Sequence, residues 1–311
     1  MRIYLTVLLL LLTGSAAADL RIVAIGDMPY AKPSDIEPKF PKFEALIKEI
    51  NKTPPDLVIH VGDVRGTEKT TCSDEILNDQ RVYMDKFDAP VLYTPGDNEW
   101  SDCHESKLGG YRPLERLDYI RKTFFDTPGQ TLGGTTLTLD HQGDKQIPEN
   151  ARLIINDILI FSLHVVGPDD GKARNGGVDR KTFKARRKAN LTWLLESFDV
   201  AKNAKAVVVA LHADMFKGSR GFNKDDQRWR EDSAFYEIGK SLNKAAKAFG
   251  KPVLLIYGDG HSHTVDWPFD KTNPNFTAVE VFGAWDVDAV DILITGERPR
   301  IYTSRLPNPL P

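Results

Sequence analysis

Cysteine is scarce in this chain, with 2 among 311 residues. Neither Cys72 nor Cys103 has a second cysteine at the spacing of a zinc site, so we do not expect a thiolate-bound zinc. An excess of basic residues is also lacking, because 41 Lys and Arg face 44 Asp and Glu, for a formal net charge of −3. A nucleic-acid surface normally requires a basic stripe, so we expect no nucleic-acid partner.

Long apolar runs are lacking after the N-terminus. Residues 1–18 combine Arg2, the apolar stretch Ile3–Leu12 and a run of alanines that ends at Ala18. This pattern predicts a signal peptide cleaved after Ala18, and hence a secreted or periplasmic protein; an N-terminal membrane anchor is the alternative. No later stretch approaches the ~20 apolar residues of a spanning helix, so we expect no membrane span in the mature chain.

Apolar runs that predict β-strands alternate with helical patterns, which indicates an α/β fold with a largely parallel core. The strands expected to lead into polar motifs are Leu20–Ile25, Asp56–Ile59, Pro90–Thr94, Ala206–Leu211 and Pro252–Tyr257. The expected helices are Phe40–Asn51, Asp74–Phe87, Tyr111–Phe125, Lys181–Phe198 and Glu231–Phe249. A tight turn between Ala151–Ile155 and Ile158–Val165 predicts a β-hairpin. Further strands are expected at Thr277–Phe282, Ala289–Thr295 and Arg300–Thr303.

A polar motif stands at the end of each of the five strands. The motifs are Gly26-Asp27-Met28-Pro29, His60-Val61-Gly62-Asp63, Gly96-Asp97-Asn98-Glu99, His212 and Gly260-His261-Ser262-His263. The carboxyl ends of strands in an open α/β sheet border one crevice, where such folds bind ligands. The candidate metal ligands at this edge are Asp27, Asp63, Asp97, His212, His261 and His263. Imidazole favours Zn or Fe and carboxylate tolerates Mn, so the set predicts a metal-dependent hydrolase.

Both cysteines lie in loops expected above this crevice. In an oxidising compartment they most simply form one disulfide, which would stabilise the chain by lowering the entropy of its unfolded state. No repeat, low-complexity block or composition break divides residues 19–311, so we expect a single domain there. Two polar segments, Asp169–Gly177 and Lys217–Arg230, are long enough for lids over the site or for surface loops.

In their order and position the motifs resemble those of the calcineurin-like metallophosphoesterases, over about Arg21 to Trp267. The family pattern is Asp-x-His, Gly-Asp-x-x-Asp, Gly-Asn-His-Asp/Glu, a lone His and Gly-His-x-His. This resemblance implies a four-layered α/β/β/α sandwich with two mixed sheets. It also implies two divalent metal ions (Mn, Fe or Zn) whose bridging hydroxide attacks the phosphorus of a small phosphoester substrate.

The resemblance also assigns the ligands to metals. Asp27 matches a carboxylate of the first metal, and Asp63 matches the carboxylate that bridges both. His212 and His261 match ligands of the second metal, whereas His263 matches the remaining imidazole on the first. Because Asp97 stands where the family has Asn, it is expected as a ligand with added negative charge.

Three further departures concern the first metal and the proton donor. Pro29 replaces the first histidine and has no ligand atom, which weakens the first-metal site. Asn98 stands where the family has the histidine that protonates the leaving group, and a carboxamide has no proton to give. A one-residue shift would instead make Asn98 the ligand and Glu99 the acid. Gly66 replaces the second Asp of the second motif, next to Arg65, a candidate phosphate clamp or carboxylate partner.

The remaining candidates lie near the motifs. His60 lies three residues before Asp63, so on a strand it faces the opposite side, which favours a structural role. His104 and His164 are alternative proton donors. Three aromatic residues are expected to pack or to form an aromatic wall for the substrate, namely Tyr30, Trp100 and Trp267.

Two functions follow from these residues. The first is an exported metal-dependent phosphoesterase that hydrolyses a mono- or diester, with Asn98, Glu99 and Arg65 as candidate catalytic residues. The alternative is a catalytically impaired family member that binds a metal or a phosphate ligand. The number of plausible ligands favours the enzyme.

Overall fold

The structure is a computed structural model that describes residues 19–30, 40–66, 70–143, 147–171, 179–217, 221–295 and 300–305. The expected signal peptide, residues 1–18, lies outside the described residues, as do 172–177 and 218–220 of the two expected loops. Within the described part of the chain, no helix is both long enough and apolar enough to cross a membrane.

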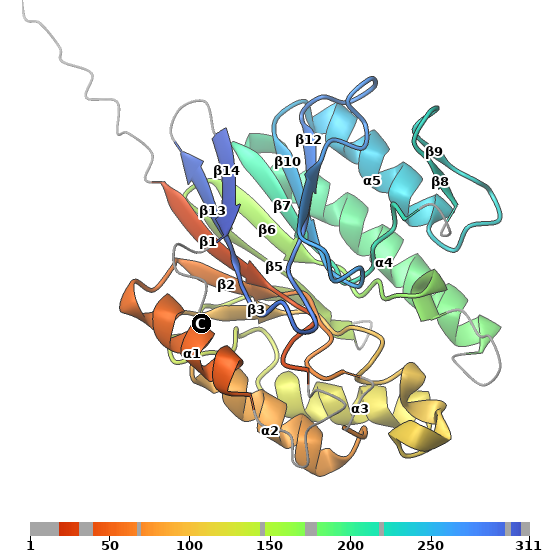
Figure 1. The fold of residues 1–311 in the computed structure, drawn as a ribbon. Coiled ribbons are helices and arrows are strands. Elements are labelled where there is room, and N and C mark those ends of the chain that lie inside the picture. Colours follow the sequence, from red (N-terminus) through yellow and green to blue (C-terminus); the bar gives the residue numbers. More distant parts are fainter. Residues whose placement is uncertain are drawn as a thin grey trace, which may run out of the picture.

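Two mixed sheets form the centre of the protein (Figure 1). The strands of the five-stranded sheet are, in spatial order, β14 (Arg300–Arg305), β13 (Val290–Thr295), β1 (Leu20–Ile25), β2 (Leu57–His60) and β3 (Val91–Tyr93). The strands of the seven-stranded sheet are β11 (Thr264–Asp266), β12 (Phe276–Glu280), β10 (Val253–Tyr257), β7 (Ala206–Ala210), β6 (Ile158–Ser162), β5 (Ile147–Ile155) and β4 (Asp140–Gln142). Strands β1 to β3 are parallel, as are β12, β10, β7 and β6, so their carboxyl ends point the same way within each sheet.

Helices cover the outer face of each sheet. The helices are α1 (Pro41–Lys52), α2 (Asp74–Asp85), α3 (Pro113–Phe124), α4 (Arg180–Val200) and α5 (Tyr236–Phe249). The first three lie against the five-stranded sheet, and α4 and α5 lie against the seven-stranded sheet (Figure 1). The expected four-layered α/β/β/α sandwich is therefore confirmed.

Alternation along the central strands explains the layering. On β7, Val208 packs in the core between the sheets, whereas Val207 and Val209 pack under the outer helices. Successive side chains of a strand point to opposite faces, so a strand covered on both sides is apolar throughout. Helix α1 needs only one apolar stripe, and its buried residues Phe43, Leu46, Ile47 and Ile50 recur at helical spacing.

The structure differs from the expected elements mainly at short or edge segments. The segment 217–230 contains a small hairpin, in which β8 (Phe222–Asn223) pairs with β9 (Arg228–Trp229). Helix α5 begins at Tyr236, five residues later than expected, because the preceding residues form turns in which Ser233 accepts a hydrogen bond from the Phe235 amide (3.2 Å). The expected hairpin of β5 and β6 is present, with Ile155 paired to Ile158.

Candidate metal centre

The carboxyl ends of both sheets meet at one place. Asp27, Asp63 and Asp97 follow β1, β2 and β3, whereas His212 and His261 follow β7 and β10. These residues form two groups in which the ligand atoms all lie within 4.8 Å of one another. The first group is Asp27, Asp63 and His261, and the second is Asp63, Asp97 and His212. Asp63 thus belongs to both groups.

His212 is oriented by a main-chain carbonyl. Its Nδ1 lies 2.8 Å from the carbonyl oxygen of Val61, which can only accept, so Nδ1 carries a proton and Nε2 is the nitrogen that faces the carboxylates. That Nε2 lies 2.9 Å from Oδ1 of Asp97 and 3.4 Å from Oδ1 of Asp63. Among the described residues, neither His212 Nε2 nor Asp97 Oδ1 has a hydrogen-bond partner. A cation between these atoms fits the arrangement, because metal-bound histidines usually donate their other N–H to such an acceptor.

Burial makes the negative charge of the second group costly. Burial raises the pKa of Asp63 well above its usual value; the positive charge of His212 opposes this shift and the charge of Asp97 adds to it. Burial alone would lower the pKa of His212, but the carboxylates of Asp63 and Asp97 raise it well above its usual value. Either a proton or a metal ion would offset this buried charge.

The first group is more open to solvent. Oδ1 of Asp27 accepts a hydrogen bond from the Asp259 amide (3.0 Å) and lies 3.4 Å from Nε2 of His261, whose side chain is 41 % exposed. His263 belongs to neither group: its Nδ1 lies 2.8 Å from the carbonyl oxygen of Glu280 and its ring packs on Phe282. This differs from the resemblance, which pairs His261 with the second metal and His263 with the first. On a strand, residues two apart share a face, but His261 has φ 61°, so the segment is not extended there and this rule does not hold for His261 and His263.

Left-handed backbone recurs among these residues. Asp27, Asp63 and His261 have φ values of 52°, 54° and 61°, a region that is unfavourable for residues other than glycine. Backbone strain of this kind gathers at functional sites. Close approach of the loops adds a second constraint, because a Cβ at Gly96 would lie 2.0 Å from Oδ1 of Asp63.

Asn98 and Glu99 tie the loops together rather than facing open solvent. The main-chain N–H of Asn98 donates to Oδ1 of Asp63 (3.0 Å), and the side-chain Nδ2 of Asn98 donates to Oδ2 of Asp63 (2.6 Å). Glu99 is fully buried, and its Oε1 accepts hydrogen bonds from the Val64 amide and the Tyr93 hydroxyl. Asp97, the residue that the direct alignment names as a ligand, stands in the second group with His212.

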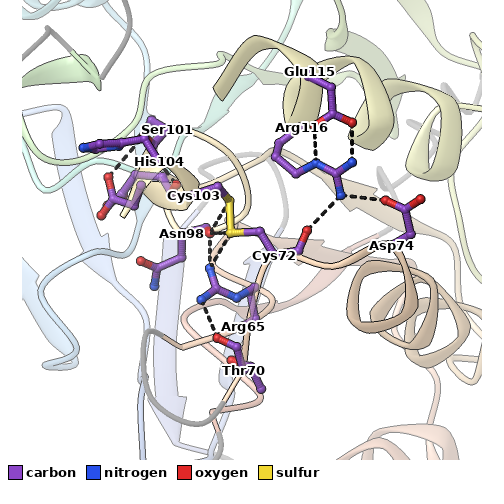
Figure 2. The surroundings of a disulfide bond; sticks show 12 residues. Arg65, Thr70, Cys72, Asp74, Asn98, Ser101, Cys103, His104, Glu115 and Arg116 are labelled. Atoms are coloured by element: carbon purple, nitrogen blue, oxygen red, sulfur yellow. Dashed lines mark hydrogen bonds and ion pairs between the residues drawn. A yellow bond between two sulfur atoms is a disulfide. The ribbon is translucent and has the colours of Figure 1, made fainter. Parts of the chain in front are cut away.

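The expected disulfide joins Cys72 to Cys103, with their Cα atoms 5.8 Å apart (Figure 2). Arg65 is buried beside it and donates to the main-chain carbonyls of Thr70 (3.0 Å) and Asn98. Each sulfur lies 3.5 Å from the same Asn98 oxygen. Arg65 and the disulfide therefore support the Asn98 loop, and the hydrogen bonds of Arg65 to described residues go to main-chain oxygens and to the Cys72 sulfur.

Three further histidines that the sequence analysis singled out have partners of their own outside both groups. His60 is buried between the Met28 carbonyl and the Gly62 amide, and burial lowers its pKa to about 4. Nδ1 of His104 lies 2.9 Å from the Ser101 carbonyl oxygen. Nδ1 of His164 lies 2.8 Å from a Glu149 carboxylate oxygen.

One residue near the centre has a closer contact than the sequence suggested. The Tyr30 hydroxyl donates to Oδ2 of Asp63 at 2.8 Å, although the sequence marked Tyr30 only as a packing or substrate-wall residue. The sole signal was its position, three residues after Asp27. Of the other two aromatic candidates, Trp100 is buried against His164, whereas Trp267 is 51 % exposed.

Comparison with known proteins identifies the family of this chain. The model of the calcineurin-like phosphoesterases matches residues 20–265. A comparison with curated proteins gave no match. Among solved structures, GAP50, described as the anchor in the inner membrane complex of Plasmodium, is 12 % identical with a TM-score of 0.49, over 93 % of this chain and 88 % of that one. A 5'-nucleotidase from Candida albicans is also 12 % identical with a TM-score of 0.49, over 92 % of this chain and 50 % of that one. Because the family model covers most of the sequence and its motifs, this chain belongs to the calcineurin-like phosphoesterase family.

Proposed function

We propose that this protein is an exported metal-dependent phosphoesterase that hydrolyses a phosphate mono- or diester at the centre built around Asp63. The observation that carries the proposal is the sharing of Asp63 between two ligand groups. In the second group, His212 Nε2 and Asp97 Oδ1 are buried 2.9 Å apart, and neither has a hydrogen bond within the described part of the chain. Membership of the phosphoesterase family supports the same conclusion.

Different residues would bind each of the two divalent metal ions. Asp27 and His261 would hold the first, Asp97 and His212 the second, and Asp63 would contact both. When bound, such a pair of ions lowers the pKa of water toward ~7 and stabilises the attacking and leaving oxygens of a phosphate ester. Manganese, iron and zinc all suit this mixture of carboxylate and imidazole.

The protein orients these ligands through hydrogen bonds. Asn98 fixes both oxygens of Asp63. The Asp259 amide fixes Asp27, and the Val61 carbonyl fixes His212. Arg65 acts indirectly, because it donates a hydrogen bond to the main-chain carbonyl of Asn98, which in turn contacts Asp63. We therefore propose Asn98, Glu99 and Arg65 as positioning residues of the reaction rather than as groups that exchange protons with the substrate.

None of the candidate residues is placed to protonate the leaving group, and this favours a second candidate function. Asn98 has no acidic proton, and His104 and His164 both contact other protein groups. General acid catalysis contributes roughly 10²–10⁴-fold. The alternative is therefore a protein that binds metal or a phosphate ligand with little turnover. The enzyme proposal limits efficient cleavage to esters with good leaving groups.

Export is part of the proposal. The disulfide is typical of an oxidising compartment. We propose that residues 1–18 are a signal peptide and that residues 19–311 form one domain that acts after secretion, in the periplasm or outside the cell. N-terminal sequencing of the protein recovered from the culture medium or periplasm tests this, and a chain that retains Met1 in the cytosol contradicts it.

Metal stoichiometry tests the centre. We expect about two metal ions per chain by elemental analysis after incubation with Mn²⁺, Fe²⁺ or Zn²⁺. Asp63→Asn should lose most of both, because it removes a charge that both groups share. The control is Asp232→Asn, which removes an exposed carboxylate near Arg230. Equal metal content in wild type and Asp63→Asn contradicts the assignment.

Hydrolysis distinguishes the two functions. The metal-loaded enzyme should cleave aryl phosphates, whose leaving groups need no proton, far faster than alkyl phosphates of the same charge. Asp63→Asn should abolish both reactions while Asp232→Asn retains them. A protein that holds two metals and cleaves neither ester class is the binding protein of the alternative.

A further inference from the structure

The hydroxyl of Tyr30 lies inside the candidate centre. It donates to Oδ2 of Asp63 (2.8 Å), accepts from Nδ2 of Asn98 (2.9 Å) and lies 3.5 Å from Nε2 of His261. The ring meets the His261 ring edge to face, with centroids 5.4 Å apart. Its oxygen therefore touches two of the three residues in the first ligand group.

Three departures from the family pattern converge on this one side chain. Pro29, which takes the place of a histidine ligand, directly precedes Tyr30. Gly66 takes the place of an aspartate, and a Cβ there would lie 2.8 Å from Cγ of the Tyr30 ring. Asn98 takes the place of the proton-donating histidine and donates to the Tyr30 oxygen. The three departures are unrelated in the sequence. In the structure, Gly66 leaves space for the Tyr30 ring and Asn98 donates a hydrogen bond to its hydroxyl.

We propose that the Tyr30 oxygen is a ligand of the first metal ion, in place of the imidazole missing at Pro29. On binding, the O–H bond breaks, an oxygen–metal bond forms and the proton passes to the buffer, as metal binding to protonated ligands requires. The first group then offers three oxygens and one imidazole, from Asp27, Asp63, Tyr30 and His261. This inference rests on the proposed metal centre and adds a ligand to it.

The neighbours of Tyr30 fit that role. The backbone of Gly66 is not in the left-handed region, so its conformation does not require glycine. The structure instead explains the glycine by space, because a Cβ at this position would collide with the Tyr30 ring. Asn98 holds the Tyr30 oxygen and Asp63 Oδ2 through the same Nδ2, so it fixes two ligand oxygens relative to each other.

Zinc titration of Tyr30→Phe tests the proposal, since the variant keeps the ring and removes only the oxygen. We expect wild type to bind two Zn²⁺, and Tyr30→Phe to bind the first-group ion at least 10-fold more weakly while the second-group ion is unaffected. Zn²⁺ has no visible or near-ultraviolet transitions of its own. The ultraviolet difference band of an ionised phenol should therefore grow with Zn²⁺ in wild type and be missing in Tyr30→Phe.

Two further variants sharpen the result. Tyr83→Phe removes a hydroxyl that contacts Glu44 on the helical face, and it should bind Zn²⁺ like wild type. Gly66→Ala keeps every hydroxyl but displaces the ring, and it should lose both the difference band and the first-group affinity. Circular dichroism and the retained second ion show that each variant is folded.

The outcomes separate the two proposals. Wild type that binds no Zn²⁺ overturns the metal centre itself. Wild type with two ions and Tyr30→Phe of equal affinity overturns only the Tyr30 assignment. Weaker binding without any phenol band in wild type also overturns it, because Tyr30 would then act by donating a hydrogen bond to Asp63.

Discussion

Buried histidines in this protein differ in charge according to what faces them. His212 faces carboxylates, and its pKa is raised. His164 is equally buried, and burial lowers its pKa to about 4 although the Glu149 carboxylate acts in the opposite direction. His60 has a similar shift, to about 4, because burial outweighs the opposite effects of its hydrogen bond to the Met28 carbonyl and of the charge of Asp27. The residue type alone therefore does not decide which histidine can take a metal or a proton.

This difference predicts how stability depends on pH. His164 has a pKa of about 4 in the folded protein against 6.5 normally, so the unfolded chain binds a proton that the folded chain refuses. Its contribution to stability is complete above pH ~6.5 and is lost as the pH falls through about 4, to an extent of about 3 kcal/mol. Urea unfolding of the metal-free protein should show stability falling over that window, and less steeply in His164→Gln.

His60 provides the matched comparison. Because His60 has the same shift, His164→Gln should remove about half of the pH dependence that the two histidines cause, and the double variant with His60→Gln the rest. The difference between variant and wild type cancels titration elsewhere. The prediction is contradicted if the free energy of unfolding falls by the same amount in wild type and in the double variant between pH 7 and pH 4.

At the scale of elements, the loops after β2 and β3 form one unit with the disulfide. The bridge joins two cysteines that lie 31 positions apart, Cys72 and Cys103, and Arg65 donates hydrogen bonds to Cys72 and to the Asn98 carbonyl (Figure 2). Asn98 in turn holds Asp63. A covalent bond outside the ligand groups is thus connected to the shared ligand through two hydrogen-bonded residues.

Removing the bridge should therefore reduce both stability and metal binding. Cys72→Ser with Cys103→Ser is expected to lower the free energy of unfolding by about 4 kcal/mol, on the loop-entropy estimate. Isothermal titration with Zn²⁺ should show weaker binding as well, because the Asn98 loop is released. Reduced wild type is the control and should behave alike. Unchanged zinc affinity in both proteins would show that the bridge supports the fold alone.

The sequence predicted long elements better than short ones. Apolar runs such as Ala206–Leu211 become buried strands because both faces of the sheet are covered. An unbroken apolar run is therefore enough to identify such a strand in the sequence. Strand β11 and the β8–β9 hairpin have only two or three residues in each strand, too few for any alternation to show. Helix α5 begins late because residues 231–235 form turns and no side chain caps the first turn of the helix.

For the site, the sequence predicted which residues gather but not every contact. Strand ends deliver Asp27, Asp63 and His212 wherever the loops fold, so their approach follows from topology. The side on which His261 lies depends on its φ of 61°, and no sequence pattern shows that angle. The contact of Tyr30 with Asp63 depends on space at Gly66, which becomes visible only when the two loops are placed together.

Across the whole molecule, the candidate centre lies where the two sheets meet. Asp27 and Asp63 come from the five-stranded sheet, whereas His212 and His261 come from the seven-stranded one. Hydrogen bonds already cross this junction, from His212 to the Val61 carbonyl and from the Asp259 amide to Asp27. Each ligand group contains residues from both sheets, so a bound ion would join the sheets in addition to holding substrate.

Metal removal should consequently destabilise the whole fold and not just the loops. An ion that binds only the folded state stabilises it by about 2.7 kcal/mol at a concentration 100 times its Kd. Chelation should therefore lower the free energy of urea unfolding by about that amount or more, and adding Zn²⁺ back should restore it. Asp63→Asn, which lacks the shared ligand, should unfold at the same urea concentration with and without metal, whereas Asp232→Asn should respond like wild type. A metal response in Asp63→Asn equal to that of wild type would mean that the ions bind elsewhere, and that the junction of the sheets is held by the protein alone.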